Sequence, residues 1–327
     1  MFRFQKSVAG MMALLFVLIM LAGCASGTNK GESANASAQQ GSSTEASANT
    51  RVIKHAMGET TITGTPKRIV TLYQGANDIV VSLGIKPVGI VESWEQQPVY
   101  DYLKADLGDV QQVGQETQPN LEEIHKLKPD LIIATKTRHE DIYEQLSQIA
   151  PTIVTDKLYD WKEGVKLIGE ASDHQDQANQ LLADWDKRTA DFKQKMGDRL
   201  PIVANIINFR EDEVRVYYLS YAGMILKDLG FTRPAGQNDE DWGAELTTKE
   251  SIPDLNADMI FNFNYDKGSP ETVKLYNDWT SSPLWANLDA VKKHQVYQVD
   301  EILWNMAGGY KSANLLLDDL YKQLKLN

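Results

Sequence analysis

The chain has 327 residues, a formal net charge of −12 and one cysteine. The acidic balance argues against nucleic acid as a partner, so any anion site must be a local cluster of basic side chains. A single cysteine excludes an intrachain disulfide and any metal site built from several cysteines.

The start of the chain has the pattern of an export signal. A short cationic segment precedes an apolar run at residues 8–21, which is shorter than the ~20 residues that span a membrane. The run ends in LAGC at residues 21–24, which resembles a bacterial lipobox. We therefore predict a lipoprotein signal peptide over residues 1–23, with Cys24 carrying acyl chains that anchor the protein to the membrane. An ordinary secretory signal with a chance cysteine is the alternative.

Residues 24–50 are mostly Ser, Ala, Thr, Gly, Asn and Gln, with no large apolar side chain. Such a segment buries too little surface to offset its conformational entropy, so we predict a flexible tether. The folded part then covers residues 51–327, a length typical of two lobes.

Residues 51–160 read as an α/β lobe. Buried apolar strands are predicted at residues 68–72, 88–91, 131–134 and 152–155, and helices at residues 76–83, 121–127 and 142–149. Apolar strands that alternate with amphipathic helices indicate a largely parallel sheet.

A linking helical segment is predicted over residues 161–197. Its second part, residues 174–196, carries apolar residues at helical spacing and no proline. At 1.5 Å per residue a helix of this length is a rod of ~35 Å, long enough to form a rigid spine between two lobes.

Residues 198–327 read as a second α/β lobe. Strands are predicted at residues 202–209, 259–263 and 295–299, helices at residues 223–229 and 313–324, and a turn-rich segment at residues 279–288. The two lobes share a short internal sequence repeat. The spacing from Glu122 to Asp130 is the same as that from Glu250 to Asp258, and each Asp lies just before a predicted buried strand. This predicts a pseudo-twofold pair of lobes, each presenting one exposed Glu.

Five segments carry a resemblance to a known family: KRIVTL at 67–72, GIKPVG at 84–89, QPNLEEI at 118–124, LKPDLII at 127–133 and NLDAVK at 287–292. The chain resembles the iron-siderophore family of ABC-transporter solute-binding lipoproteins. The resemblance implies the class III periplasmic-binding-protein fold, with two mostly parallel α/β lobes joined by one long helix. It also implies a binding protein without enzymatic activity.

Within that family the chain is most similar to the ferric-citrate-binding lipoproteins of Gram-positive bacteria. The segments concerned are TLYQGAN at 71–77, VESW at 91–94, NFR at 208–210, YAG at 221–223, TKESIP at 248–253, EILWN at 301–305 and GGYK at 308–311. Relatives that bind citrate-hydroxamate siderophores share several of them. Relatives that bind polycarboxylate siderophores carry several arginines where this chain has GQETQ at 114–118 and WNM at 304–306.

The resemblance implies a receptor anchored at the extracellular face of the cell membrane. It would capture ferric citrate between its lobes and deliver it to an ABC permease dimer. A ferric citrate-hydroxamate siderophore is the main alternative ligand, and haem or cobalamin is a more remote one. The Fe(III) belongs to the ligand, so neither a cofactor nor a direct protein ligand to the metal is expected.

An anionic ferric complex needs guanidinium groups for its outer oxygens. Arg138 follows the strand 131–134 and Arg210 follows the strand 202–209, and strand carboxyl ends are where α/β sheets bind ligands. Arg215 lies a few residues further on. For each of these arginines the alternative is a solvated surface charge.

Side chains at other strand ends would form the walls of the pocket. Tyr73 and Gln74 follow the first strand, and Trp94 follows the second. Trp242 and Trp304 lie in segments expected to face the cleft. A core position is the alternative for each tryptophan.

Glu122 and Glu250 receive a separate role from the resemblance, because one Glu on each lobe docks into arginine pockets of the permease. Charge pairs across such a face set register and association rate. An exposed helix Glu with no partner is the alternative, and Glu123 is the neighbouring candidate.

Other functional classes find little support. The chain has no Gly-x-Ser-x-Gly elbow, no phosphate-binding glycine loop and no His-Glu-x-x-His. Its five histidines are scattered along the chain, whereas a zinc or manganese receptor needs three or four ligands that converge. Met306 or Tyr73 is a candidate axial ligand for a haem iron, but the paired arginines favour an oxygen-rich anion as the ligand.

Overall fold

The computed structural model describes residues 49–237, 241–263 and 268–326. The predicted signal peptide, Cys24 and nearly all of the predicted tether lie outside these residues. The described residues belong to one compact unit, Ser47–Asn327. Its first strand, β1 (Thr50–His55), begins at the last residue that we assigned to the tether and pairs with β2 (Gly58–Thr63) as an antiparallel hairpin.

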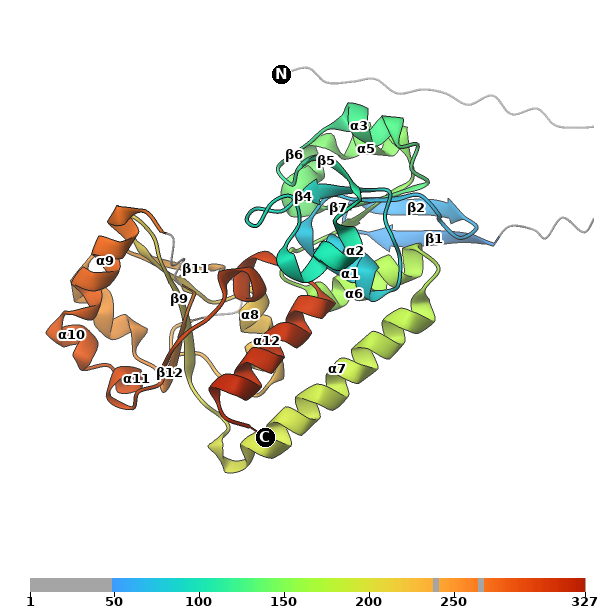
Figure 1. Ribbon diagram of the computed structural model, residues 1–327. Helices are drawn as coiled ribbons and strands as arrows, with labels where there is room; N and C mark the ends of the chain where they lie inside the picture. Colours follow the sequence, from blue (N-terminus) through green and yellow to red (C-terminus); the bar gives the residue numbers. More distant parts are fainter. Residues whose placement is uncertain (1–48, 238–240, 264–267, 327) are drawn as a thin grey trace, which may run out of the picture. The chain divides into compact units, whose positions relative to one another are not determined.

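The first lobe contains a six-stranded sheet flanked by helices (Figure 1). In spatial order its strands are β6 (Gln118–Pro119), β5 (Gln111–Gln115), β4 (Gly89–Glu92), β3 (Ile69–Thr71), β7 (Leu131–Thr135) and β8 (Thr152–Thr155). Its helices are α1 (Gln74–Ser82), η1 (Asp101–Leu103), α2 (Lys104–Leu107), α3 (Leu121–Lys126), α4 (Lys136–His139), η2 (Glu140–Ile142) and α5 (Tyr143–Ile149). Every pairing in the sheet is parallel except that of β5 with β6. The largely parallel sheet is as predicted, whereas β5 and β6 were not.

Alternation along the strands divides the core of this lobe into two layers. Ile69 and Ile133 pack in one hydrophobic cluster with residues of α1 and α6, while Val70 and Ile132 pack in another with residues of α3 and α5. Successive side chains of a strand point to opposite faces, so a strand buried on both faces has an unbroken apolar sequence.

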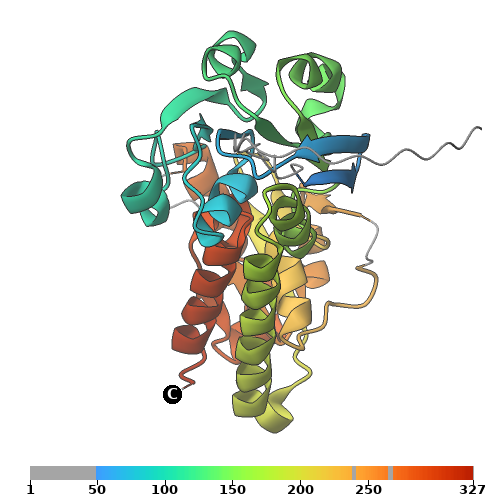
Figure 2. The ribbon, with the colours of Figure 1, turned by 90° about the vertical axis from the view of Figure 1, so that its right-hand side faces the viewer.

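Two helices link the lobes, α6 (Trp161–Ala171) and α7 (Gln175–Met196). The 22 residues of α7 make a rod of about 33 Å, which matches the predicted spine. Trp185 of α7 packs edge-on against Trp161 of α6, with ring centroids 5.1 Å apart. Both views show α7 running alongside the C-terminal helix α12 (Tyr310–Gln323) (Figures 1 and 2).

The second lobe contains a five-stranded sheet. In spatial order its strands are β11 (Gly243–Leu246), β10 (Val214–Tyr217), β9 (Ala204–Phe209), β12 (Met259–Asn262) and β13 (Val296–Gln298). Its other elements are η3 (Gly197–Arg199), α8 (Tyr221–Asp228), η4 (Lys249–Leu255), α9 (Pro270–Thr280), α10 (Pro283–Ala286), α11 (Asp289–Lys292) and the π-helical turn η5 (Ile302–Met306), with α12 closing the chain. A mostly parallel sheet was predicted, but β10 is antiparallel to both of its neighbours. The turn between β9 and β10 is too short for a parallel crossover, which needs a dozen residues or more.

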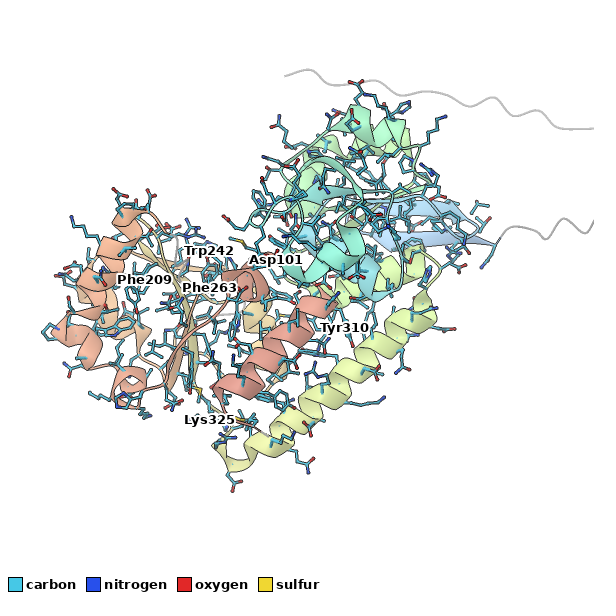
Figure 3. All side chains as sticks on the ribbon, in the orientation of Figure 1. Asp101, Phe209, Trp242, Phe263, Tyr310 and Lys325 are labelled. Carbon is cyan, nitrogen blue, oxygen red and sulfur yellow. The ribbon has the colours of Figure 1, made fainter. Side chains whose placement is uncertain are left out.

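Aromatic side chains fill the outer layer of the second lobe. Phe209 lies 6.1 Å, between ring centroids, from both Trp279 and Trp285. Figure 3 shows Phe209 and Phe263 inside this lobe. The predicted turn-rich segment at 279–288 instead includes the end of α9 and the whole of α10.

The C-terminal helix packs against both lobes. It belongs to the second lobe by its position in the chain, yet it lies against α1 of the first lobe and against the linking helix α6. The approach is close, because a Cβ atom added to Gly75 of α1 would lie 2.5 Å from the carbonyl oxygen of Gly308. Only glycine leaves room for such a contact between two backbones.

Candidate ligand-binding cleft

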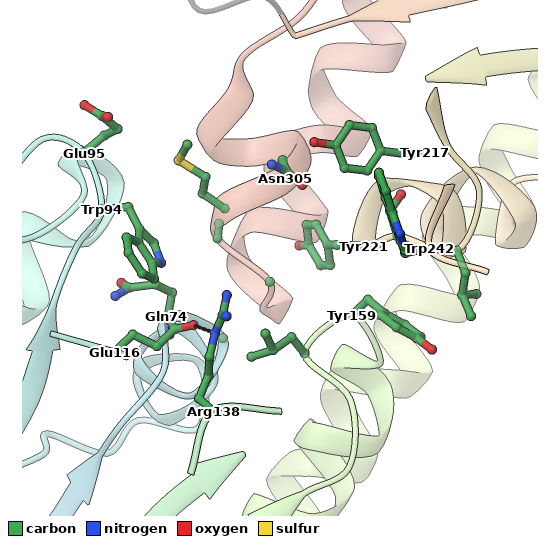
Figure 4. A pocket seen from close by; sticks show the side chains of 17 residues that line it. Gln74, Trp94, Glu95, Glu116, Arg138, Tyr159, Tyr217, Tyr221, Trp242 and Asn305 are labelled. Atoms are coloured by element: carbon green, nitrogen blue, oxygen red, sulfur yellow. Dashed lines mark hydrogen bonds and ion pairs between the residues drawn. The ribbon is translucent and has the colours of Figure 1, made fainter. Parts of the chain in front are cut away.

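A cavity of about 590 Å³ opens between the two lobes (Figure 4). Its first-lobe wall comes from loops after β3, β4, β5, β7 and β8, and its second-lobe wall from the segments around β10, α8, β11 and η5. The lining residues are Gln74, Gly75, Trp94, Glu95, Glu116, Arg138, Leu158, Tyr159, Tyr217, Leu219, Ser220, Tyr221, Trp242, Asn305, Met306, Ala307 and Gly308. In the first lobe the carboxyl ends of the parallel strands thus face the cleft, as expected for ligand sites in α/β sheets, whereas the second-lobe wall includes the antiparallel strand β10.

Arg138 is the basic residue of this cavity. It lies in the short helix that follows β7, and its Nε is 3.3 Å from Oε1 of Glu116. Its guanidinium carbon lies 5.9 Å from the centre of the Trp94 ring, within the range of a cation–π contact. Figure 4 shows Arg138 and Trp94 on one side of the cavity, with Tyr217 and Trp242 on the other.

A buried histidine fixes the loop that carries Glu116. The backbone N–H of Thr135 donates to Nδ1 of His139 at 3.1 Å, so Nδ1 is unprotonated. Nε2 then carries the proton and donates to the backbone oxygen of Glu116 at 2.9 Å. Burial lowers the pKa of His139, which favours this neutral form. The result is a rigid connection between α4 and the loop between β5 and β6.

Arg210 and Arg215 line a second cavity of about 480 Å³. Glu95 and Met306 line both cavities, so the two adjoin. Nη2 of Arg210 lies 3.6 Å from Oε1 of Glu301. Arg215 pairs with Glu213 at 2.6 Å, and Glu211 and Asp212 also line this space, which makes it richer in charge than the first cavity.

Two of the tryptophans predicted to line the pocket are partly exposed and do not lie in the core. Trp94 is 41% exposed and Trp242 is 47% exposed, and both line the first cavity. Trp242 also lies under the guanidinium of Arg215, 5.8 Å from its carbon, and edge-on to Tyr217. Such half-exposed aromatic rings suit the carbon skeleton of an organic ligand.

Two of the predicted pocket residues lie in the core instead. Tyr73 is buried among residues of the large hydrophobic cluster, while its neighbour Gln74 lines the cavity. Trp304 is fully buried and stacks on Phe261 with ring centroids 4.7 Å apart, and its indole N–H donates to Asp319. Each is therefore a packing residue, and the neighbouring side chain faces the ligand space.

Several lining residues were not predicted from the sequence, above all Glu116 and Glu301. Both are buried carboxylates beside an arginine, and a lone Glu in a loop gives no signal of burial in sequence. Tyr217 and Met306 were not assigned to the pocket either, although Met306 was considered as a haem ligand. A stronger signal was available for Met306, since it follows Asn305 in a segment already linked to the cleft.

The two proposed docking glutamates are exposed and occupy equivalent places. Glu122 lies in α3 and Glu250 in η4. In each lobe, the Asp eight residues after this Glu accepts a hydrogen bond from the backbone just before a neighbouring strand. Asp130 accepts from the backbone N–H of Arg68 at 2.8 Å, and Asp258 from that of Val203 at 3.1 Å. The internal sequence repeat therefore corresponds to equivalent structural positions in the two lobes. Docking through Glu122 and Glu250 stays a prediction.

Within residues 49–237, 241–263 and 268–326, no helix is long and apolar enough to cross a membrane. In the same described part of the chain, no three His, Cys, Asp or Glu side chains gather in a way that could hold a metal ion.

Comparison with known proteins identifies the family. The family model described as periplasmic binding protein matches residues 69–303. The chain belongs to this family. Periplasmic binding proteins of this kind bind solutes and are not enzymes, so the expectation of a non-catalytic protein is confirmed.

Individual relatives of this periplasmic binding protein are named for iron ligands. It is similar to the probable siderophore-binding lipoprotein YfiY of Bacillus subtilis, with 43% identity over 94% of this chain and 96% of that protein. It is similar to the Fe(3+)-citrate-binding protein YfmC of the same organism, with 33% identity over 98% of each chain. A crystal structure of Staphylococcus aureus SirA complexed with staphyloferrin B matches with a TM-score of 0.81 and 50% identity, over 85% of this chain and 99% of that one.

These comparisons confirm the resemblance to siderophore-binding lipoproteins and the two-lobed class III fold. Ferric citrate in particular stays a prediction, because the relatives are named for more than one ferric ligand.

Proposed function

We propose that this protein is the receptor of an ABC importer and binds an anionic Fe(III)–siderophore complex between its two lobes. The observation that carries the proposal is the placement of Arg138 and Arg210. Each follows a strand of a different lobe, and each lines one of two adjoining cavities. Guanidinium groups from two sides can hold the outer oxygens of an iron complex whose metal is already coordinated.

The ligand class follows from the cavity walls. Trp94, Trp242 and Tyr217 offer aromatic faces for the carbon skeleton of an organic ligand. The complex of SirA with staphyloferrin B at 50% identity supports a ferric siderophore with an organic backbone, and we propose staphyloferrin B or a close analogue as the first candidate. This choice gives the similarity to SirA more weight than the segments 114–118 and 304–306, which lack the arginines of relatives that bind polycarboxylate siderophores. Ferric citrate is the second candidate, supported by the similarity to YfmC over nearly the whole chain.

The location follows from the start of the chain. We propose that Cys24 carries the lipid and that the tether after it places the two lobes at the extracellular face of the membrane. The LAGC segment and the lipoprotein name of YfiY support this. Two acyl chains give durable attachment, since each buried CH₂ contributes ~0.8 kcal/mol.

Intrinsic tryptophan fluorescence tests the ligand. The chain from residue 25 onward would be titrated with ferric staphyloferrin B, ferric citrate, a ferric citrate-hydroxamate, iron-free citrate and haem. We expect saturable quenching by at least one ferric siderophore complex, with Trp94 and Trp242 as reporters in the cleft, and no response to iron-free citrate. A response to haem alone would refute the proposal.

A further inference from the structure

Each lobe places a buried glutamate against its cleft arginine. Glu116 is 4% exposed and Glu301 is 7% exposed, whereas the side chains of Arg138 and Arg210 are 36% and 40% exposed. In each pair the carboxylate is thus more deeply buried than the guanidinium beside it. Buried ionised carboxylates are costly unless they are paired and hydrogen-bonded, so this repeated arrangement calls for an explanation.

In the first lobe the glutamate is held from two sides. Oε1 of Glu116 lies 3.3 Å from Nε of Arg138, and Oε2 accepts the backbone N–H of Gln74 at 3.1 Å. The other titratable or charged groups near this carboxylate are Tyr73 and Tyr100. The imidazole of His139 is also near, but it bonds to the backbone oxygen of Glu116 and not to the carboxylate. Trp94 also hydrogen-bonds to it.

In the second lobe the pair is less complete. The 3.6 Å between Nη2 of Arg210 and Oε1 of Glu301 is too long for a hydrogen bond. Among the described residues, neither Nε of Arg210 nor Oε1 of Glu301 has a hydrogen-bond partner, although both atoms are buried. Glu95 and Asp300 also face Glu301, so its surroundings are acidic.

We infer that Glu116 and Glu301 are positioning residues that aim the two arginines into the cleft and take up protons when an anionic ferric ligand binds. Ligand affinity then rises as the pH falls. This inference rests on the proposed function, because it requires an anion at Arg138 and Arg210.

The reason is electrostatic. Burial raises the pKa of both carboxyl groups, and the neighbouring arginine opposes that rise. A bound anion adds negative charge beside each glutamate. It also weakens the electrostatic stabilisation that the neighbouring arginine gives to the ionised carboxylate. The pKa of Glu116 and of Glu301 therefore rises further in the complex. The complex then binds protons more tightly than the free protein. Affinity is therefore greatest below the pKa of the free protein and falls as the pH rises through the pKa of the complex.

The test compares the chain from residue 25 onward with the variants Glu116→Gln, Glu301→Gln and the double variant. Glutamine keeps the size and an acceptor oxygen for the arginine. Calorimetric titration with ferric staphyloferrin B and with ferric citrate, between pH 5.5 and 8 and in two buffers of different ionisation enthalpy, gives both Kd and the protons taken up. The wild type should take up protons, with Kd increasing by up to about tenfold per pH unit for each proton. Each single variant should reduce both effects and the double variant should remove them.

Glu144→Gln is the matched control, because Glu144 is exposed on α5 and lines neither cavity. It should keep the pH dependence of the wild type. Titration of the ligand itself is common to all proteins and cancels in the comparison. Equal proton uptake by the wild type and by either folded single variant would remove that glutamate from the role. If the wild type binds neither of these complexes nor a ferric citrate-hydroxamate at any pH, the proposed function fails and this inference fails with it. Normal binding with unchanged slopes overturns the inference alone.

Discussion

The buried carboxylate of Asp78, in the first lobe, accepts a hydrogen bond of 2.9 Å from the backbone N–H of Ser312, in the second. It also accepts the N–H of Lys311 at 2.7 Å and the hydroxyl of Tyr102 at 2.9 Å. These N–H groups belong to the first turn of α12, where a helix has no internal acceptors and favours negative charge. One carboxylate thus fixes the C-terminal helix against α1 and joins the lobes.

Asp78→Asn should lower the free energy of unfolding by about 2–3 kcal/mol, because the amide NH₂ would face donors instead of accepting from them. Urea unfolding measures the change. Asp106→Asn is the control at the same interface, since exposed Asp106 pairs with the ammonium of Lys311 at 2.8 Å. That exposed pair should contribute less than about 1 kcal/mol. Equal losses in the two variants would contradict the role given to Asp78.

Arg138→Ala should weaken binding of the ferric ligand at least tenfold, or about 1.4 kcal/mol. Arg138→Lys should recover only part of the loss, because an ammonium keeps the charge but lacks the planar fork of donors. Fluorescence titration measures both Kd values. Lys136→Ala is the control, since Lys136 lies in the same short helix and lines neither cavity. An affinity unchanged in Arg138→Ala would exclude this arginine from the site.

Substitution of Trp94 should affect the fluorescence response to the ligand, whereas substitution of Trp304 should affect stability. Trp94→Phe should reduce the quenching caused by the ferric ligand, because the indole lines the cavity and iron complexes quench nearby fluorophores. Trp304→Phe should leave most of that quenching intact and lower the urea midpoint instead, because it replaces a fully buried indole with a smaller phenyl ring and removes the hydrogen bond to Asp319. A loss of ligand response only in Trp304→Phe would reverse this assignment.

Glu122→Ala combined with Glu250→Ala should leave ligand affinity unchanged and reduce iron uptake. Both side chains are exposed and neither lines a cavity, so their removal acts on a partner rather than on the ligand. Uptake would be measured in cells whose only receptor is the variant. The control combines Glu144→Ala and Glu271→Ala, one exposed Glu from each lobe. Normal uptake by the first variant would refute docking through these residues.

The sequence predicted the strands that pack on both faces, because an unbroken apolar run such as 131–134 leaves no polar side to expose. It also placed Arg138 and Arg210 at strand ends, where chain order alone puts them beside the cleft. It did not predict the β1–β2 hairpin, β5, β6, β10 or β11, which are short and carry polar residues between their apolar ones, unlike the unbroken apolar runs of the buried strands.

The sequence by itself determined the two-lobed α/β fold and the basic residues available for an anion, because these follow from apolar periodicity and from the order of elements along the chain. The family came from the resemblance of several segments, such as KRIVTL at 67–72 and QPNLEEI at 118–124, to those of known proteins. Only the tertiary structure decided which of two neighbouring side chains lines the cavity. At Tyr73 and Gln74 the strand turns into a helix, and at Trp304 and Asn305 the chain forms a π-helical turn, so simple alternation no longer applies. The tertiary structure also revealed the buried Glu116 and Glu301, because a buried charge depends on a partner that is distant in the sequence.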